Sequence, residues 1–459
     1  MTLSEQLADY LLATSYDALP SEVIASSKRM IADTLACAWA GTAVAGIDSL
    51  YQLALEEGGR PDASLWGFGG KSSAGTAAFL NGVSAAALDF DCLHLGALAH
   101  SPIVILPAVM ALGEQQHVSG KEFLAAFTAG VELHCRLGMA TTDHSGWFYT
   151  SMHGVMAASG ACAKILGLDR AGICNAFGAA LAQCGGTQQA AIEQSMMKRT
   201  QSALAARAAV FSAQLAKHGT TAPRQAFEGK CGFYAMYESG DPAVVVRDLG
   251  RRHEVLQMTL KKFPSCGCNH APLEAVLQLM AENRLTAADV AEAEVSISPY
   301  MARLVGATYD PSKNALVAAQ FSVQYSVASA IMRGRLGLAE LEEGAARDRA
   351  IIERAHAVKV VVDEARTGAG LEGTATLKTT DGRKLTKTIV DLPGSPESPL
   401  PEAEFRQKAI ECFANGVSPL SAPQARALLG RIEEIEKLDD VASFFAGIAG
   451  AAGVDRQSA

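Results

Sequence analysis

The sequence has few aromatic residues, no excess of basic charge and no long uninterrupted apolar run. Aromatic side chains make up 6 % of the 459 residues although 49 % of the chain is apolar, so alanine and glycine must fill much of the interior. We therefore expect many closely packed helices. The absence of about 18 consecutive apolar residues argues against a membrane span. The net charge of −9 argues against nucleic-acid binding, and an anionic substrate would need a local cationic pocket.

Several other signals are also missing. The first residues, Met1–Gln6, show neither a secretory signal nor an Arg-rich transit peptide, so we expect a cytoplasmic location. The ten cysteines are mostly scattered singly, which predicts buried free thiols rather than a disulfide framework. There is no Gly-rich nucleotide fingerprint after a strand, no P-loop and no serine nucleophile elbow. We expect no cofactor.

The first half of the chain reads as helix. Up to about residue 262 the apolar residues follow helical periodicity with short breaks and no clear strand alternation. Val23, Ser27, Ile31 and Leu35 lie four apart in a helix expected to begin near residues 20–22 and end at 41–42. Further helices are expected over 119–137, 154–166 and 203–217.

The pattern changes after Pro264. Alternating segments predict strands at 293–298, 357–362, 374–379 and 384–390, and helices are expected between them at 315–333 and 338–349. Asp381-Gly382 predicts a hairpin turn in which both residues take positive φ. A proline-rich linker, 392–401, precedes two helices, 402–415 and 421–438, which we expect to pack back on the first half.

These patterns predict a mainly α fold. A large discontinuous all-helical domain would comprise residues 1–264 and 400–450, and a smaller α+β lid domain, 265–395, would be inserted into it. No internal repeat of fixed period indicates a solenoid.

The densest group of chemically active side chains lies between residues 89 and 102. Asp89, Asp91, His94 and His100 stand beside core-forming sequence, where charged groups cost desolvation energy. This favours a general acid–base cluster. Two alternatives stay open: a capping aspartate with a core histidine, and a metal site of Asp91, His94 and His100, whose spacing matches no closed zinc pattern.

Two cationic segments could bind an anion. Lys198 and Arg199 precede a small-residue helix, where a bound anion would offset their unfavourable position near the helix N-terminus. A solvated charge pair is the alternative. Lys261 lies at the inferred domain boundary, a usual place for ligand sites. Cys266-x-Cys268-x-His270 follows it, but its gaps are tighter than those of zinc knuckles.

A fourth segment, 147–154, carries two further candidates. Tyr149 and His153 stand at the start of a predicted helix and could reach a cleft. An aromatic staple with a capping Thr or Ser is the alternative.

In order and over nearly the whole chain, these segments resemble the MmgE/PrpD family, which includes 2-methylcitrate dehydratases, cis-aconitate decarboxylases and iminodisuccinate epimerases. The resemblance rests on the combination of several blocks, which are ADTLACAWAGT, ALDFD, MKRTQSALAARAAVFSAQLAKHG, EGKCGFYAMY, KKFPSCGCNH and AAQFSVQYSVASAI. It implies a large helical domain with an inserted lid, a homodimer and a cleft between the domains.

The resemblance also implies roles for single residues. Asp89, Asp91 and His94 match the family's Asp-Phe-Asp-Asp-Thr-His signature, and His100 matches a downstream histidine. The remaining matches are the two lysines and a lid tyrosine, at Lys198, Lys261 and Tyr325.

Five positions depart from the family pattern. Cys92 and Leu93 replace Asp-Thr, and Gln201 replaces a histidine. Phe148 stands where dehydratases and decarboxylases usually have histidine, and Tyr149 follows it instead of proline. These departures leave room for an epimerase-like pocket.

Together, the residues and the resemblance predict a cofactor-independent lyase, of dehydratase or decarboxylase type, that removes a proton next to a carboxylate of a di- or tricarboxylic acid. The candidate catalytic residues are His100, Lys198, Lys261, Asp89 and Tyr149. The candidate substrate-binding residues are Asp91, His94, Arg199, Tyr325 and His153. No metal ligand set is assigned.

Three other functions stay open. They are an iminodisuccinate-type epimerase using the same carbanion, a non-catalytic helical scaffold, and a zinc hydrolase. The expected partners are a small anionic carboxylate substrate and a second copy in a homodimer, with no nucleic acid and no membrane.

Overall fold

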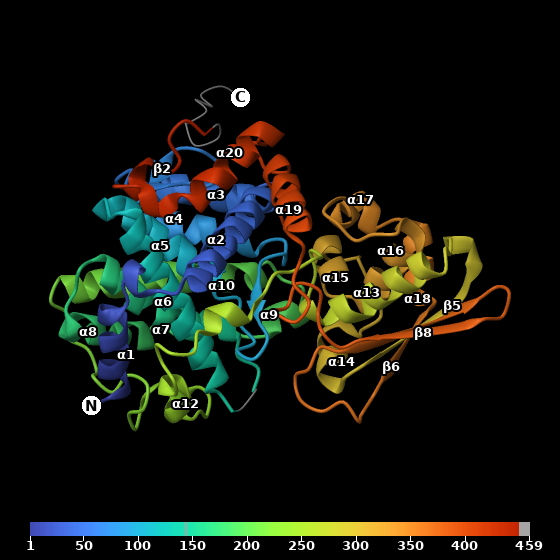
Figure 1. Ribbon diagram of the computed structural model, residues 1–459, viewed down its shortest axis with the longest axis horizontal. Coiled ribbons are helices and arrows are strands. Elements are labelled where there is room, and N and C mark those ends of the chain that lie inside the picture. The colour runs from blue at the N-terminus through green and yellow to red at the C-terminus, as the bar shows by residue number, and fades with distance from the viewer. Residues whose placement is uncertain (143–144, 449–459) are drawn as a thin grey trace.

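Two hydrophobic cores organise the chain in its computed structural model, which describes residues 1–142 and 145–448 (Figure 1). The first core is built from helices of residues 1–260 and of the C-terminal segment. The second core lies within residues 263–392 and packs helices on a sheet. The mainly α character that the sequence predicts is confirmed. The division into a 1–264 plus 400–450 domain and a 265–395 lid stays a prediction, and residues 449 and 450 lie outside the described residues.

The first core is a layered set of helices. Before residue 262 these are α1 Leu3–Ala13, α2 Ser21–Gly41, α3 Ile47–Glu57, α4 Ala74–Ala86, α5 Pro102–Gln116, α6 Gly120–Met139, α7 Tyr149–Ile165, α8 Arg170–Leu181, α9 Gln189–Ile192, α10 Met197–Lys217, α11 Phe233–Met236 and α12 Pro242–Val246. Two short antiparallel pairs interrupt them, contrary to the expectation of no strands here: β1 Ala63–Ser64 with β2 Lys71–Ser72, and β3 Leu93–His94 with β4 Met258–Thr259.

Small residues allow these helices to approach closely, as the composition predicts. A Cβ added to Gly130 of α6 would lie 2.8 Å from Ile105 Cγ2 of α5 and 2.9 Å from Ala161 Cβ of α7. Such distances are too short for any larger side chain, so the three helices depend on glycine at this crossing.

Local signals set several of the boundaries. Ser119 Oγ accepts a hydrogen bond from Glu122 N, and the Glu122 carboxylate accepts one from Ser119 N, so α6 begins with a capping box. Helix α2 spans its expected range. Helices α7 and α10 begin about five residues earlier than expected, which places Tyr149 and Lys198 in their first turns.

The second core packs helices on one face of a four-stranded sheet of order β6-β5-β7-β8. Strands β5 and β6 are parallel, and the other neighbours are antiparallel. The elements are α13 Gly267–Glu282, β5 Val290–Ile297, α14 Pro299–Val305, α15 Ala315–Gln320, α16 Val323–Arg333, α17 Glu343–Ala346, α18 Arg349–His356, β6 Val358–Val362, β7 Gly373–Thr379 and β8 Lys384–Ile389.

The expected strands are present, but three local details differ from expectation. In the hairpin turn only Gly382 has a positive φ, +89°, because a longer loop closed by Thr379 and Arg383 replaces the two-residue turn. The helix expected over 315–333 is split into α15 and α16, since Ser322 caps α16 by accepting from Tyr325 N. The helix expected over 338–349 is broken into short turns, and Asp348 caps a separate helix, α18.

The C-terminal segment returns to the first core, where α19 Glu402–Ala414 packs on α2 and is followed by α20 Ala422–Glu433. In Figure 1 both helices lie over the N-terminal helices. This return brings residues that are almost 400 positions apart into contact beneath the site described below.

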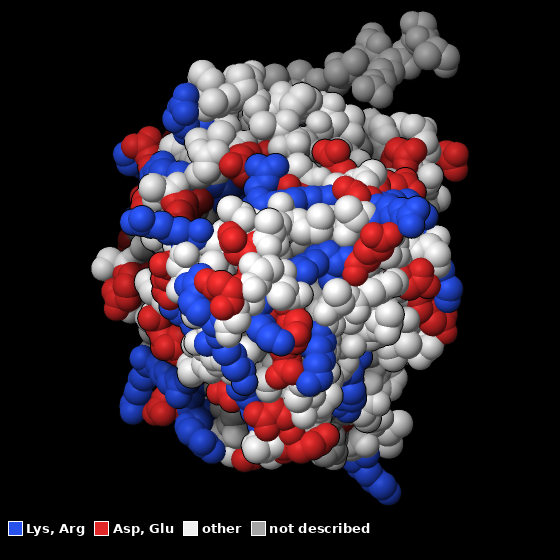
Figure 2. All heavy atoms as spheres, turned by 90° about the vertical axis from the view of Figure 1, so that its right-hand side faces the viewer, with Lys and Arg blue, Asp and Glu red and all other residues white. Residues whose placement is uncertain are grey.

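Two further features concern the charges on the surface and the apolar character of the helices. On the face made by the sheet-bearing part, acidic and basic side chains are intermingled (Figure 2). None of the described helices combines the length and apolar character needed to cross a membrane.

Candidate active site

Two chain segments meet to form the site. One connects α4 to α5 and carries Asp89 and His100, and the other runs from β4 into α13 and carries Lys261. The antiparallel pairing of Leu93 with Thr259 holds them side by side. Asp89 itself has a φ of +52°, a left-handed conformation that aspartate tolerates better than most residues.

The buried carboxylate of Asp89 joins two lysines. Lys198 Nζ, from the first turn of α10, donates to Asp89 Oδ1, and Lys261 Nζ donates to Oδ2 at 2.9 Å. Burial would raise the pKa of Asp89, but the two ammonium groups and the nearby His100 hold that pKa well below its ordinary value. Asp89 and its two lysines by themselves carry one more positive than negative charge, and the nearby carboxylate of Asp91 acts on Lys261 as well. The ammonium groups that the sequence predicts to gather here are therefore found together.

Lys261 and Lys198 differ in access. Lys261 is 1 % exposed, and it also donates to the backbone carbonyl of Asp89 at 2.7 Å. Burial works against its charge, yet Asp89 and Asp91 raise the pKa of Lys261. Lys198 keeps 14 % of its side chain exposed, and its Nζ lies 4.8 Å from the ring centroid of Phe321. Lys198 is thus the ammonium group that a bound molecule can reach.

An aspartate–histidine pair stands beside the lysines. His100 Nδ1 and Asp91 Oδ2 are 2.7 Å apart, and the side chain of His100 is 18 % exposed while that of Asp91 is buried. Burial would raise the pKa of Asp91, but His100 lowers it. With Nδ1 donating to this carboxylate, Nε2 is the ring nitrogen left for a bound molecule, which is the arrangement of an oriented acid–base histidine.

A second buried ion pair supports both segments from below. Lys408 Nζ of α19 donates to Asp33 Oδ1 of α2 at 2.6 Å, to Phe90 O at 2.8 Å and to Lys261 O at 2.9 Å. Asp33 Oδ2 accepts from Cys92 N at 3.0 Å. This pair therefore fixes the backbone on each side of the Asp89 cluster. The sequence analysis missed it, although both charged residues interrupt apolar helix faces, and that signal was available.

The cluster opens into a small cavity of about 100 Å³ lined by both cores. The first core contributes Asp89, Leu93, Leu95, Leu98, His100, Phe148, Thr187, Gln188, Ala191, Lys198 and Gln201, and the second contributes Cys266, Gly267, Cys268, Tyr300, Leu304, Phe321 and Leu371. An adjoining cavity of about 270 Å³ shares Leu98, Gln188 and Tyr300 with it, among others, and extends to Tyr149 and Arg303. Together they offer room for a small carboxylic acid.

The other candidates lie around this cavity rather than in its wall. His94 Nδ1 accepts from Ala97 N at 3.0 Å and its Nε2 lies 3.5 Å from Glu254. His153 is buried among aromatic rings with Nε2 3.0 Å from Thr141 Oγ1, and burial lowers the pKa of His153 to about 3. These two histidines have structural partners.

The structure places three further candidates outside the wall of the small cavity. Tyr149 lines only the adjoining cavity, where its hydroxyl donates to Glu238 at 3.2 Å. Tyr325 is buried in the second core and donates to the carbonyl of Glu340. The tyrosine that the second core contributes to the cavity wall is Tyr300. Arg199 is 3 % exposed and stands behind the wall, and its Nη1 has no hydrogen-bond partner among the described residues.

The structure gives no support to the metal interpretations. Within residues 1–142 and 145–448, no group of three or more His, Cys, Asp and Glu side chains is placed to hold a metal ion. His270, the third member of the Cys-x-Cys-x-His motif, is buried against Phe263 with Nε2 3.3 Å from Ser265 O.

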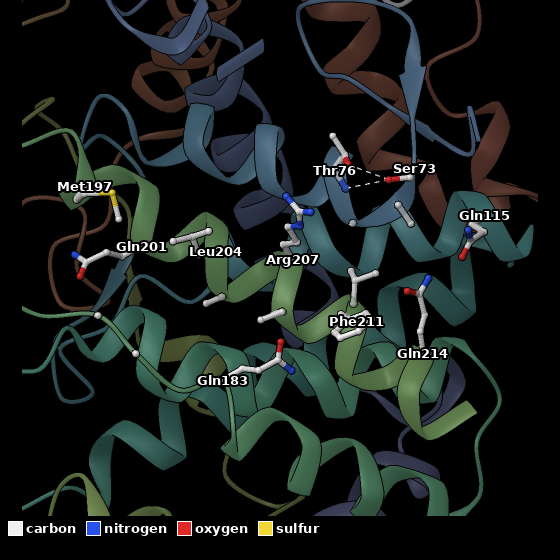
Figure 3. Close-up of a pocket in the computed structure, with 17 residues that line it drawn as sticks. Ser73, Thr76, Gln115, Gln183, Met197, Gln201, Leu204, Arg207, Phe211 and Gln214 are labelled. Atoms are coloured by element: carbon white, nitrogen blue, oxygen red, sulfur yellow. Dashed lines mark hydrogen bonds between the residues drawn. The ribbon is translucent and has the colours of Figure 1, made fainter. Parts of the chain in front are cut away.

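A larger groove of about 700 Å³ runs along the outer face of α10 (Figure 3). Its wall is mainly glutamine and apolar side chains, with Leu204 and Phe211 exposed. Arg207 is its one charged lining residue, and Glu57 binds it at 2.8 Å. The groove lacks acid–base groups, so the smaller cavity is the candidate active site.

Comparison with known proteins gives family matches over most of the chain. The chain matches the model of the MmgE/PrpD N-terminal domain over residues 5–245 and that of the C-terminal domain over 263–431. Both matched segments contribute to the cavity wall.

Alignments with related proteins cover much of the chain. The cis-aconitate decarboxylase of Aspergillus terreus is 28 % identical over 349 residues, 71 % of each chain. That of Mus musculus is 24 % identical over 96 % of this chain and 92 % of its own. The cis-aconitate decarboxylase-like protein oryM of Aspergillus oryzae is 29 % identical over 296 residues, and the chain spans 61 % of its length.

Proposed function

Because the chain belongs to the MmgE/PrpD family, we propose that it is a cofactor-independent lyase that forms a carbanion next to a carboxylate of a di- or tricarboxylic acid. The observation that carries the proposal is the sharing of one buried carboxylate, Asp89, by Lys198 and Lys261, beside the Asp91–His100 pair and at a cavity.

Lys198 is the group proposed to neutralise the developing charge. A carbanion next to a carboxylate spreads its negative charge onto the carboxylate oxygens, and a preorganised cation in a water-poor cavity stabilises that charge. Lys198 is partly exposed to the cavity, whereas Lys261 stays behind Asp89 and keeps it ionised and in place. Asp89 in turn fixes the position of Lys198.

His100 is proposed to carry the proton. Its Nδ1 is held by Asp91, so Nε2 can accept or donate a proton at the substrate. In a dehydration, His100 would take the proton from carbon before hydroxide leaves with a second proton. In a decarboxylation, carbon dioxide leaves and a proton must be returned to the carbanion.

Decarboxylation of cis-aconitate is the first reaction to test. The support is the set of relatives named cis-aconitate decarboxylases, two of which align over more than two thirds of their length. An epimerase is the second candidate, because Phe148 lines the cavity where the family resemblance leads one to expect histidine. A homodimer and a cytoplasmic location stay predictions.

The test is a proton NMR assay in deuterated water over cis-aconitate, citrate, 2-methylcitrate and iminodisuccinate. A decarboxylase converts cis-aconitate to an alkene product carrying one solvent deuteron per molecule. A dehydratase forms an alkene without loss of carbon dioxide, and an epimerase exchanges the C–H bond without forming an alkene. Absence of exchange and of product across the panel would support the scaffold and refute the proposal.

A further inference from the structure

Two cysteines in the cavity wall have no role in the chemistry described so far. Cys266 and Cys268 line the same small cavity as Asp89, His100 and Lys198, and both are free thiols. The second core supplies the thiols, whereas the first core supplies the histidine, so the two kinds of proton-carrying group enter the cavity from different walls.

The backbone places Cys266 at a helix end and lets it face the cavity. Cys266 is the N-cap of the 16-residue helix α13, and its backbone N donates to Gln320 O at 3.0 Å. Within 263–270, every residue except Cys266 is buried, and Cys266 is partly exposed. The partial positive charge at the start of a helix favours a thiolate over a thiol.

The neighbouring thiol of Cys268 also favours the thiolate of Cys266. The Cys268 thiol donates a hydrogen bond to it and, with Lys261, lowers the pKa of Cys266, although burial and Asp89 act in the opposite direction. The same hydrogen bond and burial raise the pKa of Cys268. Tyr300 of α14 is a further titratable group near both thiols, and His100 and Lys198 line the same cavity. Of the two, Cys266 is therefore the one suited to release a proton.

We propose that the Cys266 thiol, rather than His100 directly, donates the proton that quenches the carbanion. This inference rests on the proposed function. The S–H bond breaks as a C–H bond forms with the electron pair of the carbanion, and the thiolate remains beside Cys268 and Lys261. His100, which lines the same cavity, then returns a proton to the thiolate and is itself reprotonated by water after product release. Both groups therefore serve the decarboxylation, and the cycle needs no oxidant or reductant.

The first arm of the test is kinetic. Cys266→Ala lowers kcat for decarboxylation of cis-aconitate by about 10²–10⁴-fold, the usual contribution of a general acid, with KM changed by less than about threefold. Because only the protonated thiol donates, the wild-type rate falls as pH rises past the lowered thiol pKa, and the variant loses this alkaline limb. Cys231→Ser, which removes an exposed thiol, is the matched control and keeps wild-type kinetics.

The second arm needs no turnover. Iodoacetamide alkylates Cys266 at pH 7 faster than the exposed Cys231, as followed by peptide mass spectrometry, and tricarballylate, a saturated tricarboxylate, slows the reaction at Cys266 alone. If Cys266→Ala does not fold, Cys266→Ser carries the same expectation, because its hydroxyl is a much weaker acid.

The outcomes separate the two proposals. Wild-type kcat and an intact alkaline limb in Cys266→Ala, or labelling of Cys266 no faster than Cys231, would overturn the role of the thiol while leaving the lyase in place. A wild-type protein that turns over no acid in the panel would overturn the lyase, and the thiol donor with it.

Discussion

Two buried lysine–aspartate clusters are linked in this molecule through the backbone carbonyls of Phe90 and Lys261, and they behave differently. In one, Lys408 binds Asp33, and neither residue belongs to the wall of the active-site cavity. In the other, Lys198 and Lys261 bind Asp89, and both Asp89 and Lys198 line that cavity. The same residue types therefore form a closed support and an open reactive site.

The carboxylates differ in the direction of their pKa shifts. Burial raises the pKa of Asp33, because one ammonium group does not offset the loss of solvent. Burial also acts to raise the pKa of Asp89, but two ammonium groups and His100 outweigh it and lower that pKa. An excess of cations around a buried anion, with one cation accessible, is what distinguishes a site able to stabilise new negative charge.

The largest expected effect comes from replacing His100, the histidine beside the Lys198–Asp89–Lys261 cluster. His100→Asn lowers kcat by about 10²–10⁴-fold because the oriented acid–base group is lost. Steady-state kinetics on cis-aconitate measures this. The matched control is His117→Asn, since His117 is exposed and its partner is Asp440, and it should leave kcat unchanged. Equal effects of the two substitutions would contradict the assignment.

The next effect concerns the accessible ammonium group. Lys198→Ala lowers kcat by about 10²–10³-fold, the cost of removing one preorganised charge-stabilising donor. Lys217→Ala, at the other end of the same helix, is the control and leaves kcat unchanged. Thermal melting of both variants should resemble wild type, because Lys261 still pairs with Asp89. A loss of folding without a specific loss of kcat would contradict the proposed role.

Breaking the Lys408–Asp33 cluster should reduce stability and leave kcat nearly unchanged. Lys408→Met leaves Asp33 buried without its cation and lowers the free energy of unfolding by about 3–5 kcal/mol. Urea unfolding measures this loss, and the folded fraction keeps kcat within a few-fold of wild type. Adding Asp33→Asn to Lys408→Met should restore part of the stability. A large loss of kcat in the fully folded double variant would contradict the purely structural role of the Lys408–Asp33 pair.

The smallest expected effect is a dependence of the free energy of unfolding on pH. The folded pKa of Asp89 is below its unfolded value of about 3.9, so its contribution to stability is present above that pH and is lost as pH falls below it. The difference in unfolding free energy between wild type and Asp89→Asn should therefore narrow below about pH 4. Asp33 acts oppositely, because its raised pKa favours the protonated form. Urea unfolding at several pH values checks both signs.

Much of the local structure could be predicted from the sequence. The capping box at Ser119 and Glu122, the periodicity of α2 and the four strands of the sheet all have local signals. The segments carrying Asp89, Lys198 and Lys261 stood out because charged groups beside apolar sequence are costly.

Long-range contacts could not be predicted in the same way. Lys408 and Asp33 are 375 residues apart, and nothing in either helix specifies the other. Whether a tyrosine or histidine reaches the cavity depends on the tertiary packing, which turns Tyr325 and His153 into the interior and brings Tyr300 and Cys266 to the wall. Sequence identifies groups that are expensive to bury, but the fold decides which of them stay open.

Solvent-deuterium incorporation into cis-aconitate and its product, compared between Lys198→Met and Lys408→Met at a temperature where both are folded, tests the central claim most directly. The account predicts that Lys408→Met incorporates deuterium at nearly the wild-type rate, whereas Lys198→Met has lost about two to three orders of magnitude. Equal incorporation by the two variants would contradict it.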